Sequence, residues 1–509
     1  MATPDRVRRF LTTKSVRRNT LANLVARVIS AALAFAAIPI LLSKLGAEAY
    51  GLVGLAVVLE SLFALLDLGL STAVNREVAR NIGTNRDPEA NRDLLRTLEA
   101  IYWPIGLVIL VAVIVLAVWL ASGGLNTDQL SESTVQLSLS VLAFTLTIRW
   151  PLSLYAGVLR GLEAQLLYNG LQLLGPIIRL AGGVAVVTWV SPTVEAFFVT
   201  DLVGSIVQIV LIAAAAWRSL PPSSQRPRFR FSIIQSLWRF ALAYNAIVIL
   251  TQLLMQSGTL FVARMLPLRD VGFYAVASSL AGVVIYVPYA LVEASFPRFT
   301  SELERRNVTE FSSTYRFTLN TSALSIMAVA VPIVFFSKDF LFVWTRSSEV
   351  ASHAAAAAAM LAIGSLLYAL WAFPYTALLS AGLVRYPLIV NLVVVPLALA
   401  VSPYAISTAG LPGAAAVWVA ASACFLSAFP IALGRKVSGT AGMNMWARPV
   451  AIVMTAVGAF GVLSLATKGW SSMARLAALT ICDLALSGAT AAWLLRRDHR
   501  WRWAEERRR

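Results

Sequence analysis

Three arginines of this sequence lie inside long apolar stretches, where a charge is costly. Arg27, Arg149 and Arg179 each stand in a run of about 20 mostly apolar residues, the length with which an α-helix crosses ~30 Å of hydrocarbon. An arginine there costs about 2.5–3.5 kcal/mol on insertion scales, so it faces a bundle interior or a water-filled cavity. Its planar, permanently charged guanidinium group binds phosphate oxygens in pairs. These arginines are therefore candidate ligands of a phosphate-bearing substrate.

Three carboxylates also fall within apolar stretches: Glu60, Asp67 and Asp201. Glu60 and Asp67 are seven residues apart, which places them on one face of a continuous helix. A carboxylate in a partly dry cavity can take up and release protons, so all three are candidate coupling residues. The alternative is structural, in which Arg149 or Arg179 only neutralises Asp201 or Asp67 in an internal ion pair and binds no substrate.

Predicted helix breaks near two of the arginines favour the functional interpretation. Arg149 precedes Pro151, and Arg179 follows Gly175 and Pro176. Proline interrupts the helical hydrogen-bond ladder, and backbone freed at membrane depth must find partners or line a cavity. The two arginines are thus expected at irregular points of their helices.

The composition predicts a membrane protein. Hydrophobic residues make up 58% of the 509 residues and charged residues 13%, with a mean hydropathy of +0.75. About 14 apolar stretches between Thr20 and Leu495 each have the length of a membrane span. The expected fold is an all-α integral membrane protein with about 14 transmembrane helices.

The net charge of +17 reports topology rather than nucleic acid binding. Lys and Arg concentrate in alternate loops and at both ends, whereas residues 122–134 on the opposite side contain none. The positive-inside rule then places both termini in the cytoplasm. Basic segments at the ends are expected to bind anionic lipid of the bilayer.

The inventory of motifs excludes the common enzyme classes. The sequence has no phosphate-binding G-x-x-x-x-G-K-[ST] loop, no H-E-x-x-H and no G-x-S-x-G, and it has two histidines. The two cysteines, Cys424 and Cys482, lie inside apolar runs and indicate buried thiols. We therefore expect no catalytic residues, no metal site and no cofactor.

The chain is predicted to contain two six-helix pseudo-repeats followed by two extra helices. A shift of 221 residues pairs Gly51 with Gly272 and Leu59 with Leu280. Paired repeats of this kind bind substrate between the halves. The predicted parts are a basic arm (1–19), an N-terminal lobe (20–216), a basic linker (217–239), a C-terminal lobe (240–433), two helices (448–495) and a basic tail (496–509).

The opening region resembles Wzx-type polysaccharide flippases of the MATE-like MOP exporter superfamily. The residues that carry the resemblance are Asn19, Asn23, Pro39, Leu45-Gly46, Tyr50-Gly51-Leu52, Leu66-Asp67-Leu68-Gly69-Leu70 and Arg76. The resemblance implies a flippase that moves an undecaprenyl-diphosphate-linked oligosaccharide to the periplasmic leaflet by alternating access, for O-antigen, capsule or exopolysaccharide synthesis.

The same resemblance implies a lumen with a cationic lining, to which we add Asn23. The sequence leaves three alternatives for coupling, namely protons, sodium or no ion. A polysaccharide polymerase and a chain-length regulator are the protein partners that it suggests. Because the second half lacks an intramembrane arginine around residues 244–297, such a lining would be lopsided in this chain.

Two other functions stay open from the sequence. A drug or organic-cation antiporter of the same architecture should have an anionic lumen rather than three intramembrane arginines. A membrane glycosyltransferase or polymerase should have large outer loops with acidic catalytic residues, and the loops here are short.

Overall fold

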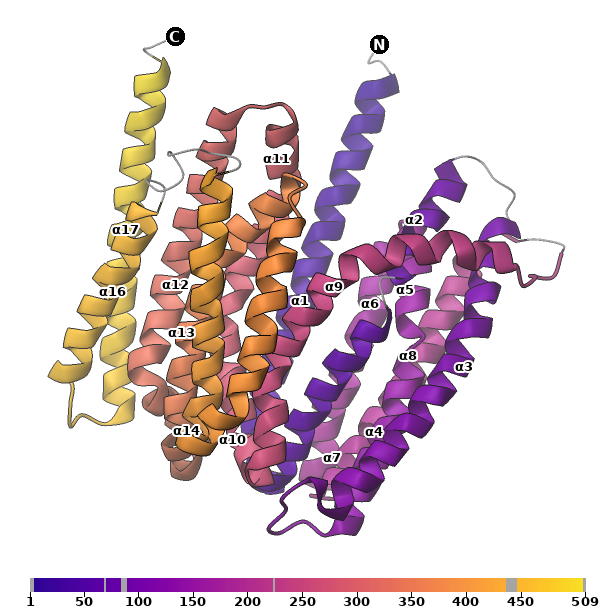
Figure 1. The fold of residues 1–509 in the computed structure, drawn as a ribbon, viewed down its shortest axis with the longest axis horizontal. Helices are drawn as coiled ribbons and strands as arrows, with labels where there is room; N and C mark the ends of the chain where they lie inside the picture. The colour runs from indigo at the N-terminus through magenta and orange to yellow at the C-terminus, as the bar shows by residue number, and fades with distance from the viewer. Residues whose placement is uncertain (1–3, 68–69, 84–88, 223–224, 436–445, 507–509) are drawn as a thin grey trace. The chain divides into compact units, whose positions relative to one another are not determined.

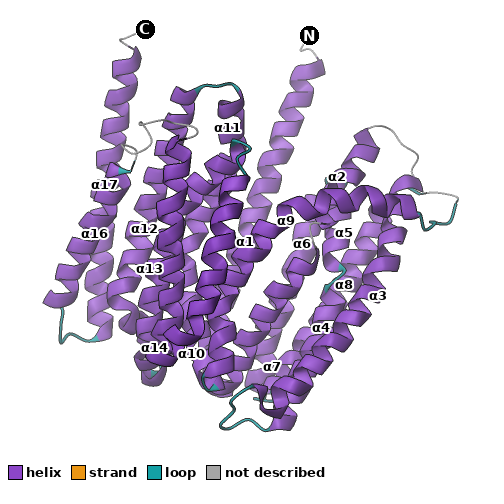
Figure 2. Ribbon diagram, in the orientation of Figure 1, coloured by secondary structure: helices purple, strands orange, loops and turns teal. Residues whose placement is uncertain are grey.

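The computed structural model describes the backbone of residues 4–67, 70–83, 89–222, 225–435 and 446–506. Side chains are described over the same ranges except for 4–28, 83, 232–246 and 495–506. Figure 2 shows that the described backbone consists of helices joined by short loops. The expected all-helical class is therefore confirmed for this part of the chain.

The chain divides into two compact units: 1–249 together with 267–272, and 250–266 together with 273–509. The elements of the first unit are α1 (Pro4–Ala64), the 3₁₀ turn η1 (Leu65–Asp67), α2 (Leu70–Gly83), α3 (Glu89–Trp119), the π-helical turn η2 (Leu120–Gly124), α4 (Glu132–Arg149), α5 (Leu152–Gly161), α6 (Gln165–Pro176), the π-helical turn η3 (Ile177–Gly182), α7 (Gly183–Trp189) and α8 (Val194–Ser219).

Two helices continue from the first unit into the second, namely α9 (Phe231–Met265) and α10 (Leu268–Gly282). The second unit continues with the 3₁₀ turn η4 (Val283–Ile285), α11 (Tyr286–Glu304), α12 (Val308–Thr345), α13 (Ser348–Ser380), α14 (Arg385–Leu433), α16 (Ala447–Ala466) and α17 (Ser472–Glu506). Figure 1 labels these helices along the chain.

Twelve described helices are long and apolar enough to cross a membrane. Two of them hold two spans each, because a glycine with positive φ interrupts them: Gly46 (φ 82°) in α1 and Gly410 (φ 61°) in α14. Only glycine adopts such angles without steric cost. Counting both arms of these helices reaches the predicted total of about 14 spans.

Beside the Gly46 break, α1 crosses the start of α10 at very short range within the first unit. A Cβ added to Gly51 would collide with the carbonyl oxygen of Leu268, and one added to Gly272 would collide with that of Ala47. Each glycine therefore meets the residue four positions before the other. Only glycine allows two backbones to approach so closely.

The C-terminal pair α16 and α17 packs on α12 of the second unit. Their shared core contains buried Met327 and Phe336 from α12 and Phe460 from α16. The Arg475 guanidinium of α17 lies 2.7 Å from the Asp339 carboxylate and 5.0 Å from the ring centre of Phe336. The two extra helices thus join the second unit through both apolar and charged contacts.

Candidate functional site

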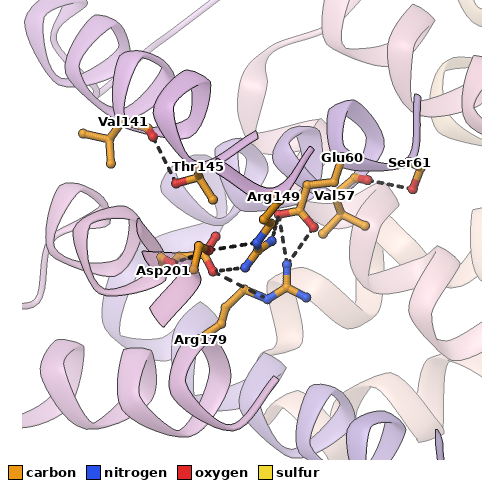
Figure 3. Close-up of polar contacts among 9 residues, drawn as sticks. Val57, Glu60, Ser61, Val141, Thr145, Arg149, Arg179 and Asp201 are labelled. Carbon is orange, nitrogen blue, oxygen red and sulfur yellow. Dashed lines mark hydrogen bonds and ion pairs between the residues drawn. The ribbon is translucent and has the colours of Figure 1, made fainter. Parts of the chain in front are cut away.

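Four charged side chains meet inside the first unit, and each comes from a different element. Glu60 lies on the second arm of α1, Arg149 is the last residue of α4, Arg179 lies on η3 and Asp201 lies on α8. Figure 3 shows the four side chains pointing toward one another. We call these residues the charged quartet.

Helix breaks position both arginines, as the sequence suggested. α4 ends at Arg149, and α5 begins after Pro151. The helix that contains Pro176 continues into the π-helical turn that carries Arg179. Single π-helical turns are rare, and they frequently occur at functional sites.

The α6 break is stabilised by α8. Pro176 has no N–H for the carbonyl of Gln172, and the Gln208 side chain donates to that oxygen instead at 3.3 Å. Gly175 leaves the space that this side chain needs, because a Cβ there would lie 2.6 Å from Gln208 Oε1. Since Asp201 and Gln208 are seven residues apart on α8, the break and the carboxylate share one helix face.

Arg149 is fully engaged by three partners. Its Nη1 donates to Glu60 Oε1 at 2.8 Å, its Nη2 donates to Asp201 Oδ1 at 2.5 Å, and its Nε donates to Ser205 Oγ at 2.8 Å. Ser205 in turn donates to the Asp201 carbonyl at 2.7 Å. Arg149 therefore holds α1, α4 and α8 together.

Arg179 is less completely satisfied. Its Nη1 donates to both carboxylate oxygens of Glu60, at 2.9 and 2.8 Å. Its buried Nε has no hydrogen-bond partner among the described residues and lies 4.0 Å from Asp201 Oδ1. Buried donors are normally paired, so this N–H is left to donate to an oxygen of a ligand.

The quartet is closed on one side and open on the other. The Asp201 side chain is 3% exposed, whereas those of Glu60 and Arg179 are 22% and 25% exposed. Two arginines and two carboxylates make the quartet neutral overall. A ligand thus has access to Glu60 and Arg179, where it would compete with an existing ion pair.

Asp67 belongs to a different cluster. It ends η1, after α1 has ended at Ala64, and it accepts hydrogen bonds from Tyr102 (2.8 Å), Ser153 (2.7 Å) and the Ser71 amide (3.2 Å). Glu60 and Asp67 have no partner in common among these contacts. The continuous helix expected from their spacing is interrupted, so the shared-face argument does not apply.

Two candidate residues lie outside the described side chains, namely Arg27 and Asn23. Sequence reasoning also missed Ser205, Tyr102 and Ser153, because hydroxyl groups are common in membrane helices and no spacing marks those that contact a charge. No group of three or more metal-ligating side chains occurs among the residues described.

Comparison with known families supports a transporter. The family model described as "Polysaccharide biosynthesis protein" matches residues 16–302, and the MatE model matches residues 246–404. No curated protein matches the chain.

Solved transporters share the fold. The lipid II flippase MurJ in an inward closed conformation is similar over 94% of this chain and 99% of its own, with a TM-score of 0.68 and 11% identity. An inward-facing multidrug resistance MATE family transporter of the MOP superfamily is similar over 84% and 96%, with a TM-score of 0.65 and 17% identity.

A MOP superfamily transporter from Pyrococcus furiosus, described as having a reversed polarity of its binding pocket, is similar over 86% and 96%, with a TM-score of 0.57 and 16% identity. At such identities the likeness concerns the fold, which is that of MOP superfamily transporters.

Proposed function

We propose that this chain, which belongs to the polysaccharide biosynthesis protein family, flips an undecaprenyl-diphosphate-linked oligosaccharide between the leaflets of the membrane. The observation that carries the proposal is the pairing of Arg149 and Arg179 with one carboxylate, Glu60. Two guanidinium groups that converge on one pair of oxygens have the arrangement that a phosphate group needs. The unpartnered Nε of Arg179 adds a third donor.

In this proposal Glu60 occupies the place of the substrate in the resting protein. Protonation of Glu60 removes its negative charge, so that the two arginines exceed Asp201 by one positive charge. The diphosphate then displaces Glu60, and release of the substrate on the other side lets the carboxylate return and lose its proton. The binding of a proton is thereby coupled to the binding of the substrate.

The quartet disfavours the alternative of an organic-cation antiporter. Both of its carboxylates are already paired with arginine, so an organic cation would find no free negative charge. The glycosyltransferase alternative gains no support from the comparisons, because the solved structures with this fold include a flippase and a multidrug transporter.

Orientation is part of the same proposal, with both termini in the cytoplasm of the bacterial inner membrane and transport toward the periplasm. Reporter fusions ending at Gly83, Ser223 and Gly439 should read cytoplasmic, and those ending at Thr127 and Ser347 should read periplasmic. A periplasmic signal at Ser223 would overturn the orientation.

The decisive experiment is a flipping assay in vesicles that contain purified protein and a fluorescent undecaprenyl-diphosphate-linked oligosaccharide. We expect the wild-type protein to expose the inner-leaflet lipid to an external reagent. Arg149→Lys should slow flipping at least about tenfold, because lysine lacks the bidentate fork. Arg160→Lys is the matched control, since among the described residues Arg160 donates only to the Ala156 carbonyl and lies over the Tyr168 ring. Proton-driven exchange of an organic cation without lipid flipping would refute the proposal.

A further inference from the structure

An uncharged cavity lies inside the second unit, apart from the charged quartet. It has a volume of about 340 Å³ and is bounded by α9, α10, α13 and α14. All of its lining residues are described, and none of them is charged. The volume is within the range of about 300–1,000 Å³ that small-molecule sites have.

Four polar side chains of this cavity lack a partner among the described residues, whereas a fifth, Ser257, donates to the Leu254 carbonyl at 2.8 Å. The Gln256 amide and the hydroxyls of Tyr274, Ser278 and Ser365 line it, and the structure gives these side chains no hydrogen bond to any described residue. Tyr274 and Ser365 are each only 4% exposed. Gln256 and Ser278 are partly buried, so the four side chains present donors and acceptors to the cavity that water or a ligand can bind.

Two glycines fix the geometry of the lining. A Cβ on Gly258 would collide with the Tyr274 hydroxyl, and one on Gly364 would collide with the Trp418 ring. The Trp418 ring is also stacked on Tyr368, with centroids 6.0 Å apart. The hydroxyl and the indole are therefore held in place before any ligand enters, which lowers the entropic cost of binding.

We infer that this cavity binds a nonionic sugar ring of the transported lipid-linked saccharide. A pyranose has C–H groups on its faces, which suit an indole, and hydroxyls around its edge, which suit the four unpaired groups. A diphosphate is excluded by the lack of a positive charge, and an organic cation by the lack of a carboxylate. The inference rests on the proposed function and adds the residues that contact the sugar.

Gly282 provides a test that leaves the quartet intact. It lines the cavity, and a Cβ added there would have no atom within 4 Å. The start of a leucine side chain therefore has room, and Gly282→Leu should reduce the volume of the cavity. Gly458→Leu is the matched control, because Gly458 lies on α16, outside the cavity, and its added Cβ also meets nothing within 4 Å.

The experiment is a competition between two lipids, read by native mass spectrometry of the full-length protein. One lipid is undecaprenyl diphosphate, and the other is the undecaprenyl-diphosphate-linked saccharide extracted from the cells that make the protein. Wild-type protein and Gly458→Leu should prefer the saccharide lipid about tenfold, the value of one to three hydrogen bonds. Gly282→Leu should bind both lipids equally.

The outcomes separate the two proposals. Binding of both lipids with a preference that Gly282→Leu leaves unchanged overturns the sugar site and keeps the flippase. Failure of the wild-type protein to bind either lipid overturns both. A third outcome is that the wild-type protein binds ethidium, Gly282→Leu abolishes this binding, and neither lipid is preferred. The cavity would then bind an organic cation, and the inference would be overturned. Release of the bound saccharide lipid by excess free saccharide would show that the site recognises the sugar itself.

Discussion

The polar side chains in the interiors of the two units differ in how completely they are paired with other side chains. In the first unit the charged quartet is almost completely paired, and Arg149 alone makes three hydrogen bonds. In the second unit four of the hydroxyl and amide groups that line the cavity have no partner among the described residues. The difference follows from cost, because an unpaired buried charge is far more destabilising than an unpaired hydroxyl.

The contrast shows that the charged residues and the cavity belong to different units of this protein. When no substrate is present, a buried charged side chain needs a counter-ion from the protein itself. A neutral polar side chain needs only water as a hydrogen-bond partner. A substrate that carries both a diphosphate and sugars presents one chemistry to each kind of site. The following variants test the contrast, from the largest expected effect to the smallest.

Arg149→Ala should have the largest effect on stability. It leaves the Asp201 carboxylate, 3% exposed, with no guanidinium closer than that of Arg179 at 4.0 Å. Breaking a buried ion pair costs about 3–5 kcal/mol of the free energy of unfolding. Arg179→Ala should cost less, because Arg149 still donates a hydrogen bond to each of the two carboxylates. Unfolding in detergent measures this, with Arg160→Ala as the control, and equal losses for Arg149→Ala and Arg160→Ala would refute the quartet.

Tyr102→Phe should have the next largest effect. It removes a hydroxyl that donates to the Asp67 carboxylate at 2.8 Å, and a hydrogen bond to a charged group contributes about 1.5–3 kcal/mol to stability. Ser153 and the Ser71 amide continue to bind Asp67, so the protein should still fold. The same unfolding measurement applies, and a loss below about 0.5 kcal/mol would show that this bond has no net value.

Glu60→Gln should change transport more than stability. The amide mimics the protonated carboxyl, so the arginines lose their competitor and undecaprenyl diphosphate should bind about tenfold more tightly, or about 1.4 kcal/mol. Flipping in vesicles should lose its dependence on an imposed pH gradient. Asp67→Asn is the control, since Asp67 is held by Tyr102 and Ser153 outside the quartet. If wild-type flipping ignores both pH and sodium gradients, coupling through Glu60 is wrong.

Tyr274→Phe should have the smallest effect. It is the counterpart of Tyr102→Phe, because both tyrosines are buried: Tyr274 is 4% exposed and Tyr102 is 1% exposed. Of the two hydroxyls, only that of Tyr102 has a hydrogen-bond partner among the described residues. Removing an unpaired buried hydroxyl should change the free energy of unfolding by less than about 0.5 kcal/mol or raise it. A loss as large as that of Tyr102→Phe would mean that Tyr274 has a bound partner, and the contrast between the units would fail.

The sequence predicted what single helices determine. Span length and hydropathy located the helices, and Pro151 and Pro176 marked the irregular points near Arg149 and Arg179. Glu60 bridges both arginines only because α1, α4, η3 and α8 pack together. The spacing of residues along a single helix does not predict this packing. The ion-pair alternative stated from the sequence named Arg149 and Asp201 as partners, and the structure contains this pair.

The cavity of the second unit could not be predicted from the sequence at all. Ser278, Ser365 and Gln256 are residue types that occur throughout membrane helices, where a hydroxyl normally bonds to a carbonyl of its own helix. Ser279, next to Ser278, does this with the Ala275 carbonyl at 2.8 Å. Only the positions of neighbouring helices distinguish the paired serine from the unpaired one.

The crossing of α1 with α10 has a consequence for the history of the chain. Gly51 faces Leu268 while Gly272 faces Ala47, so the same offset of four residues is repeated in both directions. Such reciprocity defines an isologous contact, the kind that joins the subunits of a two-fold symmetric homodimer. Here both copies of the contact surface lie in one polypeptide, as they would after duplication and fusion of a gene for a dimeric ancestor. One ancestral glycine would then have supplied both sides of the crossing.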